Sequence, residues 1–178
     1  MTPIEHYEQL SLDTMAKEYP ITAETTPARY WDLKWKFPPQ RKAGDLEKVI
    51  KKFTEMLGFQ CSKITTSGTY VKGTKVIGVS TSLGTTKSGD TGHYIPGGST
   101  KGVADLVLTI YGLKLDCEIK FSKGDRQRKT QIAYQAMVEK AGGFYMIAHS
   151  FEDFYEQFYD FLELPQVRLM KEYFDNNK

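Results

Sequence analysis

Two carboxylates and a lysine have the residue types and the spacing that best suit chemistry in this chain. Asp105 lies in an apolar-rich run from Val103 to Tyr111, and Glu118 lies near the end of a second run from Leu113 to Phe121. The runs meet at Gly112, a pattern typical of two strands joined by a tight turn. Because the start of one hairpin strand lies beside the end of the next, we expect the two carboxylates to be neighbours.

The second run places a lysine on the same face as one of these carboxylates. Side chains alternate along a strand, so apolar residues share one face, and Lys114, Asp116, Glu118 and Lys120 share the other. Adjacent carboxylates repel each other, and Mg²⁺ or Mn²⁺ bound between them offsets that repulsion. We therefore expect Asp105 and Glu118 to bind a divalent metal and Lys120 to hold or activate an attacking water. Charges that simply face water at a strand end are the alternative that spacing leaves open.

A helix is expected to bring a third acid to this end of the sheet. Asp45 looks like the N-cap of a helix that reaches Leu57, with Gly58 after it. Glu47 lies at the edge of the apolar stripe of this helix, whereas Glu55 points the opposite way. Glu47 is therefore a candidate site residue, and an acid that only favours the positive helix N-terminus is the alternative.

Basic residues and a glutamine follow the second strand. The segment 121–129 carries Lys123, Arg126, Arg128 and Lys129, and is the strongest basic cluster in the chain. Its place beside the proposed metal site favours contact with the phosphate backbone of DNA over a solvated loop. Thr130 can cap the next helix, in which Gln131 begins a face shared with Tyr134, Gln135 and Val138.

Several ordered motifs resemble the PD-(D/E)XK nuclease superfamily, and more closely its virus-type replication-repair nuclease (VRR-NUC) branch. Residues 101–105, K-G-V-A-D, are similar to that branch's K-G-x-P-D, and 118–120, E-I-K, to its E-[VI]-K. Gln131 and the glycine pair 142–143 match its Q…G-G element, and residues 150–153 its S-x-E-D helix start. The resemblance covers about Asp45 to Phe158. Ala104 replaces the usual proline, which removes a backbone constraint and no ligand.

The resemblance implies a fold and a set of roles. It implies an α/β restriction-endonuclease-like core of αβββαβ order with helical additions at both ends, the same order that the residue patterns give. Asp105, Glu118 and the main-chain carbonyl of Ile119 would bind the metal, and Glu47 would support a second metal. Gln131 would position water or Lys120. Stand-alone members of this branch occur in phages and resolve branched DNA as homodimers.

Composition sets broad limits. The chain has 178 residues, enough for one domain with a sizeable core, and a net charge of +2 that does not by itself indicate a nucleic-acid binder. We expect an N-terminal arm at 1–44, a nuclease core at 45–162 and a C-terminal helix at 163–178. No transmembrane span or signal peptide is expected, and two reduced cysteines favour the cytoplasm, that of a bacterial host if the chain is phage-encoded. The three histidines lack the spacing of a zinc site.

Two segments have open interpretations. The arm interleaves cations and aromatics from Arg29 to Phe37, a composition that stacks on bases or packs as a strand on the core. The segment Ser80–Gly102 is rich in Gly, Ser and Thr, and we expect a loop that either lies near the substrate or is plainly mobile.

The sequence predicts a Mg²⁺- or Mn²⁺-dependent DNA endonuclease, with a Holliday junction resolvase of DNA recombination as the first choice. The expected DNA contacts are Lys101, Lys123, Arg126, Arg128 and Lys129. Repair, flap or nicking nucleases of the same fold are alternatives, and so is a non-catalytic DNA-binding accessory protein. A homodimer would supply the two symmetric cuts that a junction needs.

Overall fold

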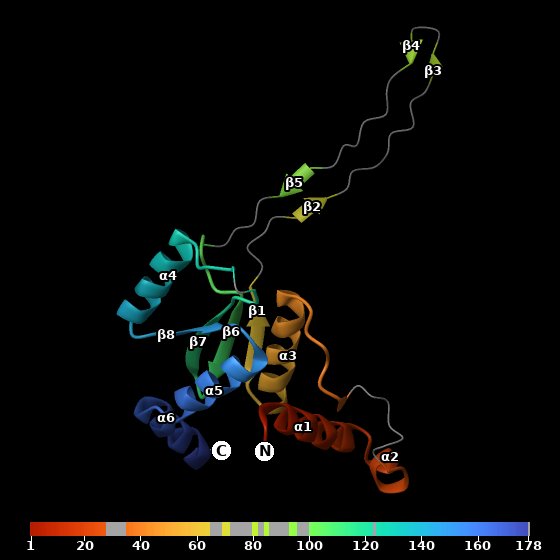
Figure 1. Cartoon of the computed structure of the whole chain (residues 1–178), viewed down its shortest axis with the longest axis vertical. Helices are drawn as coiled ribbons and strands as arrows, with labels where there is room; N and C mark the ends of the chain where they lie inside the picture. Colours follow the sequence, from red (N-terminus) through yellow and green to blue (C-terminus); the bar gives the residue numbers. More distant parts are fainter. Residues whose placement is uncertain are drawn as a thin grey trace.

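The computed structural model describes residues 1–27, 35–64, 69–71, 80–81, 84–85, 93–95, 100–122 and 124–177. Within these residues the chain is a mixed α/β protein, with helices before and after its main sheet (Figure 1). Both termini lie at the end of the molecule opposite to strands β2 (Thr69–Val71) and β5 (His93–Ile95) (Figure 1).

The main sheet has four strands in the described residues, in the order β1-β6-β7-β8. Strand β6 (Leu106–Ile110) runs antiparallel to both of its neighbours, β1 (Gln60–Lys63) and β7 (Leu113–Ile119). Strand β8 (Phe144–Ala148) lies parallel to β7. Helix α3 precedes β1, and α4 lies between β7 and β8. The predicted α/β class is therefore present, and α3, α4 and the four strands of the main sheet follow the αβββαβ order, with further short strands between β1 and β6.

The hairpin between β6 and β7 forms because its two turn residues accept a left-handed backbone. Tyr111 has φ 48° and Gly112 has φ 76°, which is the geometry of a two-residue turn that matches the twist of the strands. Leu106 pairs with Cys117, so the start of β6 lies beside the end of β7. The predicted hairpin is confirmed, although its strands are shorter than the runs 103–111 and 113–121.

The helices begin and end at defined residues: α1 Pro3–Glu18, α2 Pro20–Thr25, α3 Ala43–Met56, α4 Lys129–Lys140, α5 Phe151–Leu162 and α6 Pro165–Asn176. Two predicted N-caps are wrong. Helix α3 starts at Ala43, and Asp45 lies in its first turn, where its carboxylate accepts a hydrogen bond from the Arg41 N–H at 3.1 Å. Helix α4 begins at Lys129, so Thr130 lies inside it.

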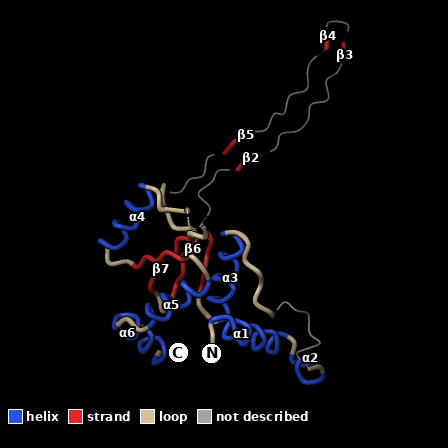
Figure 2. Tube along the Cα trace, viewed as in Figure 1, coloured by secondary structure: helices blue, strands red, loops and turns tan. Residues whose placement is uncertain are grey.

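One face of the sheet carries the hydrophobic core. Helices α3 and α5 pack on each other and on this face, while α4 stands apart from them (Figure 2). Phe53 of α3 and Phe158 of α5 are fully buried there with Leu115 and Cys117 of β7. Tyr7 of α1 is also buried and contacts Phe53, so the predicted N-terminal arm contributes to the core.

The segment before α3 also packs on the core, as far as it is described. Phe37 lies 5.2 Å from Tyr7 and 5.0 Å from Phe151 between ring centroids. This contact confirms the packing alternative for Phe37. The part of the cation and aromatic run at residues 29–34 lies outside the described residues.

Short strands correct the prediction of a loop across Ser80–Gly102. Strand β5 pairs antiparallel with β2, and β3 (Ser80–Thr81) pairs with β4 (Gly84–Thr85). Figure 1 shows β2 and β5 beyond the end of the main sheet at which β1 ends and β6 begins. Residues 72–79, which follow β2, lie outside the described residues. None of the described helices is long and apolar enough to cross a membrane.

Candidate active site

Asp105 and Glu118 meet at one end of the hairpin, as predicted. Asp105 directly precedes β6, and its Oδ2 accepts a hydrogen bond from the Ile119 N–H of β7 at 3.0 Å. The Asp105 main-chain carbonyl accepts a second bond from the Ile64 N–H at 2.9 Å, which ties the residue to the end of β1. Asp105 is therefore held from both neighbouring strands.

Lys120 is the partner of Glu118. Its Nζ lies 2.8 Å from Glu118 Oε1, and the side chains are 7% and 1% exposed. Two further oxygens lie near Nζ, Gln131 Oε1 at 3.3 Å and Asp125 Oδ1 at 3.6 Å. The lysine is thus almost buried among three oxygen-bearing side chains, which excludes the solvated-edge interpretation for this pair.

The main chain of Lys120 is fixed as firmly as its ammonium group. Its N–H donates to the Ala148 carbonyl at 2.9 Å, and its own carbonyl accepts a hydrogen bond from His149 Nδ1 at 2.8 Å. His149 immediately follows β8. The end of β8 therefore positions the main chain of Lys120, a role for His149 that sequence reasoning missed.

Gln131 bridges the helix and the strand. Its Nε2 donates to Glu118 Oε1, and its Oε1 accepts hydrogen bonds from Lys120 and from the Arg128 N–H at 2.8 Å. Gln131 lies in the first turn of α4, so this helix is anchored to the site by its N-terminal end. The expectation that Gln131 lies near Lys120 is confirmed.

A glycine lets the chain approach α4 closely before it reaches Asp105. Gly102 has φ +88°, and a Cβ added there would lie 2.3 Å from the Thr130 main-chain oxygen. Any side chain at this position would collide with the start of α4. The glycine of the K-G-V-A-D motif therefore has a structural cause in this chain.

Burial and like charges disfavour ionisation of both carboxylates. Burial is the largest cause that raises the pKa of Asp105, and the charge of Glu47 adds to it. Burial likewise raises the pKa of Glu118, the charges of Asp105 and Asp125 add to it, and Lys120 opposes it. A cation between the two carboxylates would offset both the burial and the repulsion.

Two buried carboxylate oxygens have no hydrogen-bond donor among the described residues: Glu118 Oε2 at the site, and Asp116 Oδ1 on the same strand. A buried carboxylate oxygen without a donor costs free energy unless a cation or a water meets it. Together with Asp105 and the main chain of Ile119, Glu118 Oε2 suits a hard divalent cation such as Mg²⁺.

Glu47 lies close to the site but has its own partner. Its carboxylate forms an ion pair with Lys63 at the end of β1, and its charge acts on Asp105. In the described chain no group of three or more His, Cys, Asp and Glu side chains is placed to hold one metal ion. Asp105 and Glu118 could supply two carboxylate ligands to a metal, whose other ligands would be a carbonyl, water or phosphate.

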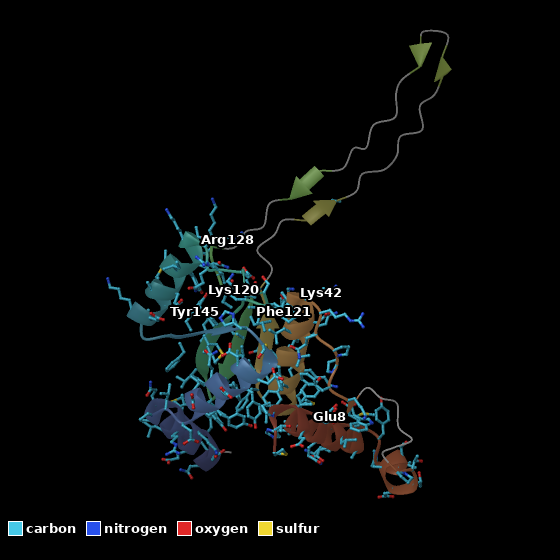
Figure 3. The ribbon with its side chains drawn as sticks, in the orientation of Figure 1. Glu8, Lys42, Lys120, Phe121, Arg128 and Tyr145 are labelled. Carbon is cyan, nitrogen blue, oxygen red and sulfur yellow. The ribbon has the colours of Figure 1, made fainter. Side chains whose placement is uncertain are left out.

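The predicted DNA contacts surround the site on the side of α4. Lys101, Arg126, Arg128 and Lys129 are all exposed, and Lys123 lies outside the described residues. Figure 3 shows Arg128 above Lys120, near α4, and Lys42 to the right of Lys120, near the start of α3. Basic side chains thus lie both near α4 and near the start of α3.

Further polar residues lie beneath α4 that the sequence analysis did not assign to the site. Asp116 is fully buried, and its Oδ2 accepts hydrogen bonds from Lys114 at 2.9 Å and Tyr134 at 3.2 Å. Tyr145 of β8 pairs with Asp116 in register, and its hydroxyl is buried without a hydrogen-bond partner in the described chain. Burial and the charge of Glu118 raise the Tyr145 pKa. Alternation along Phe144–Ala148 could have placed Tyr145 on the face of Asp116 and Glu118.

Comparisons with protein-family models, with curated proteins and with solved structures each find no match to this chain.

Proposed function

We propose that the chain is a Mg²⁺- or Mn²⁺-dependent DNA endonuclease, and that its substrate is branched DNA, with the four-way Holliday junction as the first choice. The observation that carries the proposal is the pair of adjacent carboxylates, Asp105 and Glu118, with Lys120 buried beside them. The buried Glu118 oxygen without a partner supports a metal at this pair. The αβββαβ order of elements supports a PD-(D/E)XK core, since the resemblance of the motifs implies the same order.

Asp105, Glu118 and the carbonyl of Ile119 would hold the metal. When bound, Mg²⁺ lowers the pKa of a coordinated water and offsets charge on the phosphate that is attacked. The Ile119 N–H and the ends of β1 and β8 keep these ligands and Lys120 in place before DNA binds.

Lys120 would act on the water and on the phosphate. Its ammonium group is shared among Glu118, Asp125 and Gln131, so it is oriented by several oxygens. An oriented lysine can hold the attacking water by a hydrogen bond and stabilise the charge that develops on the phosphate. Gln131 is a positioning residue, because it contacts both Glu118 and Lys120.

DNA binding would draw on the exposed cations around the site. Lys101, Arg126, Arg128 and Lys129 neutralise backbone phosphates without reading sequence. A homodimer would present two such sites to the two strands that are cut in a junction. In the same setting we propose roles in DNA recombination or repair, in a phage or its bacterial host.

The test is cleavage of a labelled four-way junction beside linear duplex, flap and single-stranded DNA, with Mg²⁺, Mn²⁺ or EDTA. We expect paired symmetric nicks in the junction for the wild type, and no nicks in EDTA or with Asp105→Ala. Cleavage of flaps or duplex in preference to the junction would keep the nuclease and discard the resolvase.

A non-catalytic DNA-binding protein is the second candidate. The Lys120 ammonium group contacts three oxygens of its own chain, which is compatible with a purely structural role for this lysine. Such a protein would bind branched DNA equally well in EDTA and in Mg²⁺ and would cut none of the four substrates. That pair of results would replace the nuclease proposal.

A further inference from the structure

A lysine-rich surface runs along helix α3, on the side of the candidate site away from α4. We define this α3 lysine surface by six residues: Lys36, Lys42, Lys48, Lys51, Lys52 and Lys63. Four of them belong to or immediately precede α3, Lys63 ends β1, and Lys36 lies in the segment that leads to α3. None of these residues belongs to the basic cluster near α4.

The surface begins beside Asp105. Lys63 pairs in register with Leu106, the residue after Asp105, and its ammonium group binds the Glu47 carboxylate. A cavity of about 250 Å³ lies here, lined by Leu106, Glu47, Lys63 and three further lysines of the surface, which are Lys42, Lys48 and Lys51. The lysines are thus continuous with the end of the sheet that carries the candidate site.

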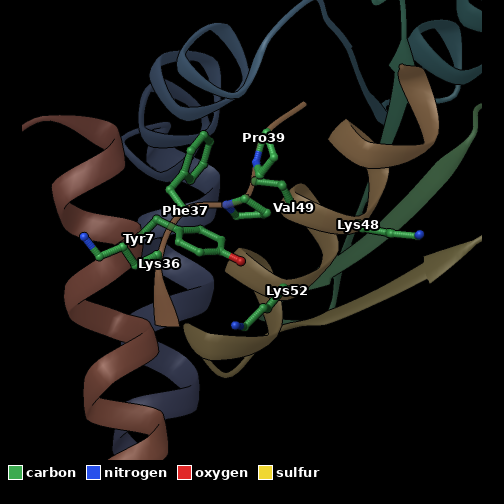
Figure 4. Close-up of a pocket in the computed structure, with 8 residues that line it drawn as sticks. Tyr7, Lys36, Phe37, Pro39, Lys48, Val49 and Lys52 are labelled. Atoms are coloured by element: carbon green, nitrogen blue, oxygen red, sulfur yellow. The ribbon is translucent and has the colours of Figure 1, made fainter. Parts of the chain in front are cut away.

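A second cavity continues the surface past Lys48, which lines both. Its volume is about 360 Å³, and Tyr7, Phe37, Pro38 and Pro39 form its apolar wall. Figure 4 shows that these walls come from α1 and from the segment before α3, while Lys48 and Lys52 come from α3. The Tyr7 ring extends toward α3 with its hydroxyl at the tip (Figure 4).

The chain supplies carboxylates to only part of this surface. Lys63 pairs with Glu47, and Lys51 lies 3.8 Å from Glu55. Lys52 is held by Ser11 Oγ at 3.1 Å and lies over the Tyr7 ring, and Lys36 lies over the Trp35 ring. The nearby Glu8 of α1 accepts the Phe37 N–H.

Three exposed cations of the surface remain available to a ligand. Lys36, Lys42 and Lys48 are exposed and form no ion pair with a described carboxylate. Exposed lysines that are spread along a concave, partly apolar surface suit a polyanion with spaced charges, because each ammonium group acts as a separate point charge. The phosphate backbone of DNA has such spaced charges.

We infer that the α3 lysine surface binds the phosphate backbone of a second DNA arm, opposite the arm that the basic residues near α4 contact. The inference rests on the proposed function, because it takes branched DNA as the ligand. A junction sends its arms in different directions from the point that is cut, so a nuclease that selects branches needs basic surfaces on both sides of its site. A linear duplex that fills one surface would leave the other empty.

The test compares two double variants of the full chain in EDTA, where no cleavage occurs. Lys36→Ala/Lys48→Ala removes two exposed lysines of the surface, and Lys140→Ala/Lys171→Ala removes two exposed lysines at the end of α4 and on α6. Fluorescence anisotropy measures binding of a labelled four-way junction and of a linear duplex at several salt concentrations, and circular dichroism checks that each variant folds.

We expect the surface variant to bind the junction roughly ten- to fifty-fold more weakly at 0.1 M salt, with the slope of log K against log salt smaller by about two. The control variant should stay within about twofold of the wild type. Binding of the linear duplex should change less than binding of the junction. Equal weakening of junction binding by both variants would overturn the inference, because only the total charge of the protein would then matter. An unchanged slope of log K against log salt in the surface variant would also overturn it.

These results separate the inference from the proposed function. If the wild type cuts junctions but the surface variant binds them normally, the nuclease stands and the second surface is wrong. If the surface variant loses binding but the wild type cuts nothing in Mg²⁺ or Mn²⁺, the surface stands and the nuclease is wrong. A wild type that binds no DNA would overturn both.

Discussion

The two faces of the main sheet are built from opposite kinds of residue. The face under α3 and α5 is filled by aromatic and aliphatic side chains, among them Phe53 and Phe158. The face under α4 holds Asp116, Glu118 and Lys120, all buried, and α4 itself has no buried residue. Apolar burial stabilises a fold, whereas buried ionised groups cost desolvation energy. The comparison indicates that one face holds the fold together and the other carries the ionisable groups of the candidate site.

The polar face itself contains two similar ion pairs on one strand. One pair joins Lys114 to Asp116 on β7, and the other joins Glu118 to Lys120, which directly follows β7. In both pairs the lysine and the carboxylate are two residues apart. Lys114 is 55% exposed and Lys120 only 7%. Glu118 has a second carboxylate, Asp105, nearby; burial raises the pKa of Glu118, and the charge of Asp105 adds to this shift. Of the two pairs, the one with Glu118 therefore lies beside a second carboxylate, as the proposed metal site requires.

Substituting the two buried carboxylates of β7 one at a time tests the difference between the two ion pairs most directly. We expect Glu118→Gln to lower the rate of junction cleavage by about 10⁴-fold, because a lost metal ligand forfeits several kcal/mol of transition-state stabilisation. Asp116→Asn, the matched control, should stay within about threefold. Single-turnover cleavage measures both, and equal losses would show that burial alone makes these residues important.

A large-to-small change on the apolar face should act on stability instead. We expect Phe53→Ala to lower the free energy of unfolding by about 3–5 kcal/mol, because Phe53 is fully buried and contacts rings from α1 and α5. Tyr134→Phe, on the polar face, should cost about 1 kcal/mol for its hydrogen bond to Asp116. Chemical denaturation distinguishes the two, and similar losses would contradict the division between faces.

Gln131 tests whether α4 positions the site. We expect Gln131→Ala to weaken metal affinity and cleavage by about 10- to 100-fold, the range seen when a ligand's supporting hydrogen bond is lost. Gln135→Ala, one turn further along α4, should have little effect, because Gln135 contacts Gln127 and Glu139 and neither carboxylate of the site. A second variant, Gln131→Glu, keeps the length of the side chain. Full cleavage activity in either Gln131 variant would contradict a positioning role for Gln131.

The smallest expected effect is a gain in stability. The pKa of Asp105 is raised in the folded chain, mainly by burial, so its ionised form destabilises the metal-free fold at a pH above that folded pKa. This penalty disappears below the pKa of the unfolded chain. In EDTA at pH 8, Asp105→Asn should therefore raise the Tm by a few degrees at most, and the gain should vanish toward pH 3. A lower Tm for Asp105→Asn at pH 8 would contradict this electrostatic account.

The hairpin and the charged residues at its end could be predicted from the sequence. Alternation in two runs joined at Gly112 is enough to place Asp105 beside Glu118 and Lys120 on the same face as Glu118. Both are local consequences of strand geometry. The apolar stripe of α3 was predicted for the same reason, since its spacing is read directly from the chain.

The burial of the polar face could not be predicted in the same way. Hydrophobic periodicity assigns a strand's charged face to solvent, yet α4 covers it with Gln131 and Tyr134. The same helix leaves Ile132 and Met137 exposed at 52% and 56%. A helix that turns polar residues inward reverses the usual pattern. The predicted starts of α3 and α4 were also wrong. Their N-cap residues are Lys42 and Arg128, which are not among the residue types that usually cap a helix.

The most direct test of the central account is Mn²⁺ binding measured by electron paramagnetic resonance, with and without junction DNA. The account predicts one site per chain for the wild type and for Asp116→Asn, and loss of that site in Asp105→Ala and in Glu118→Gln. Equal Mn²⁺ binding by the wild type and by Asp105→Ala, or none by the wild type even with DNA present, would contradict a metal held at this end of the sheet.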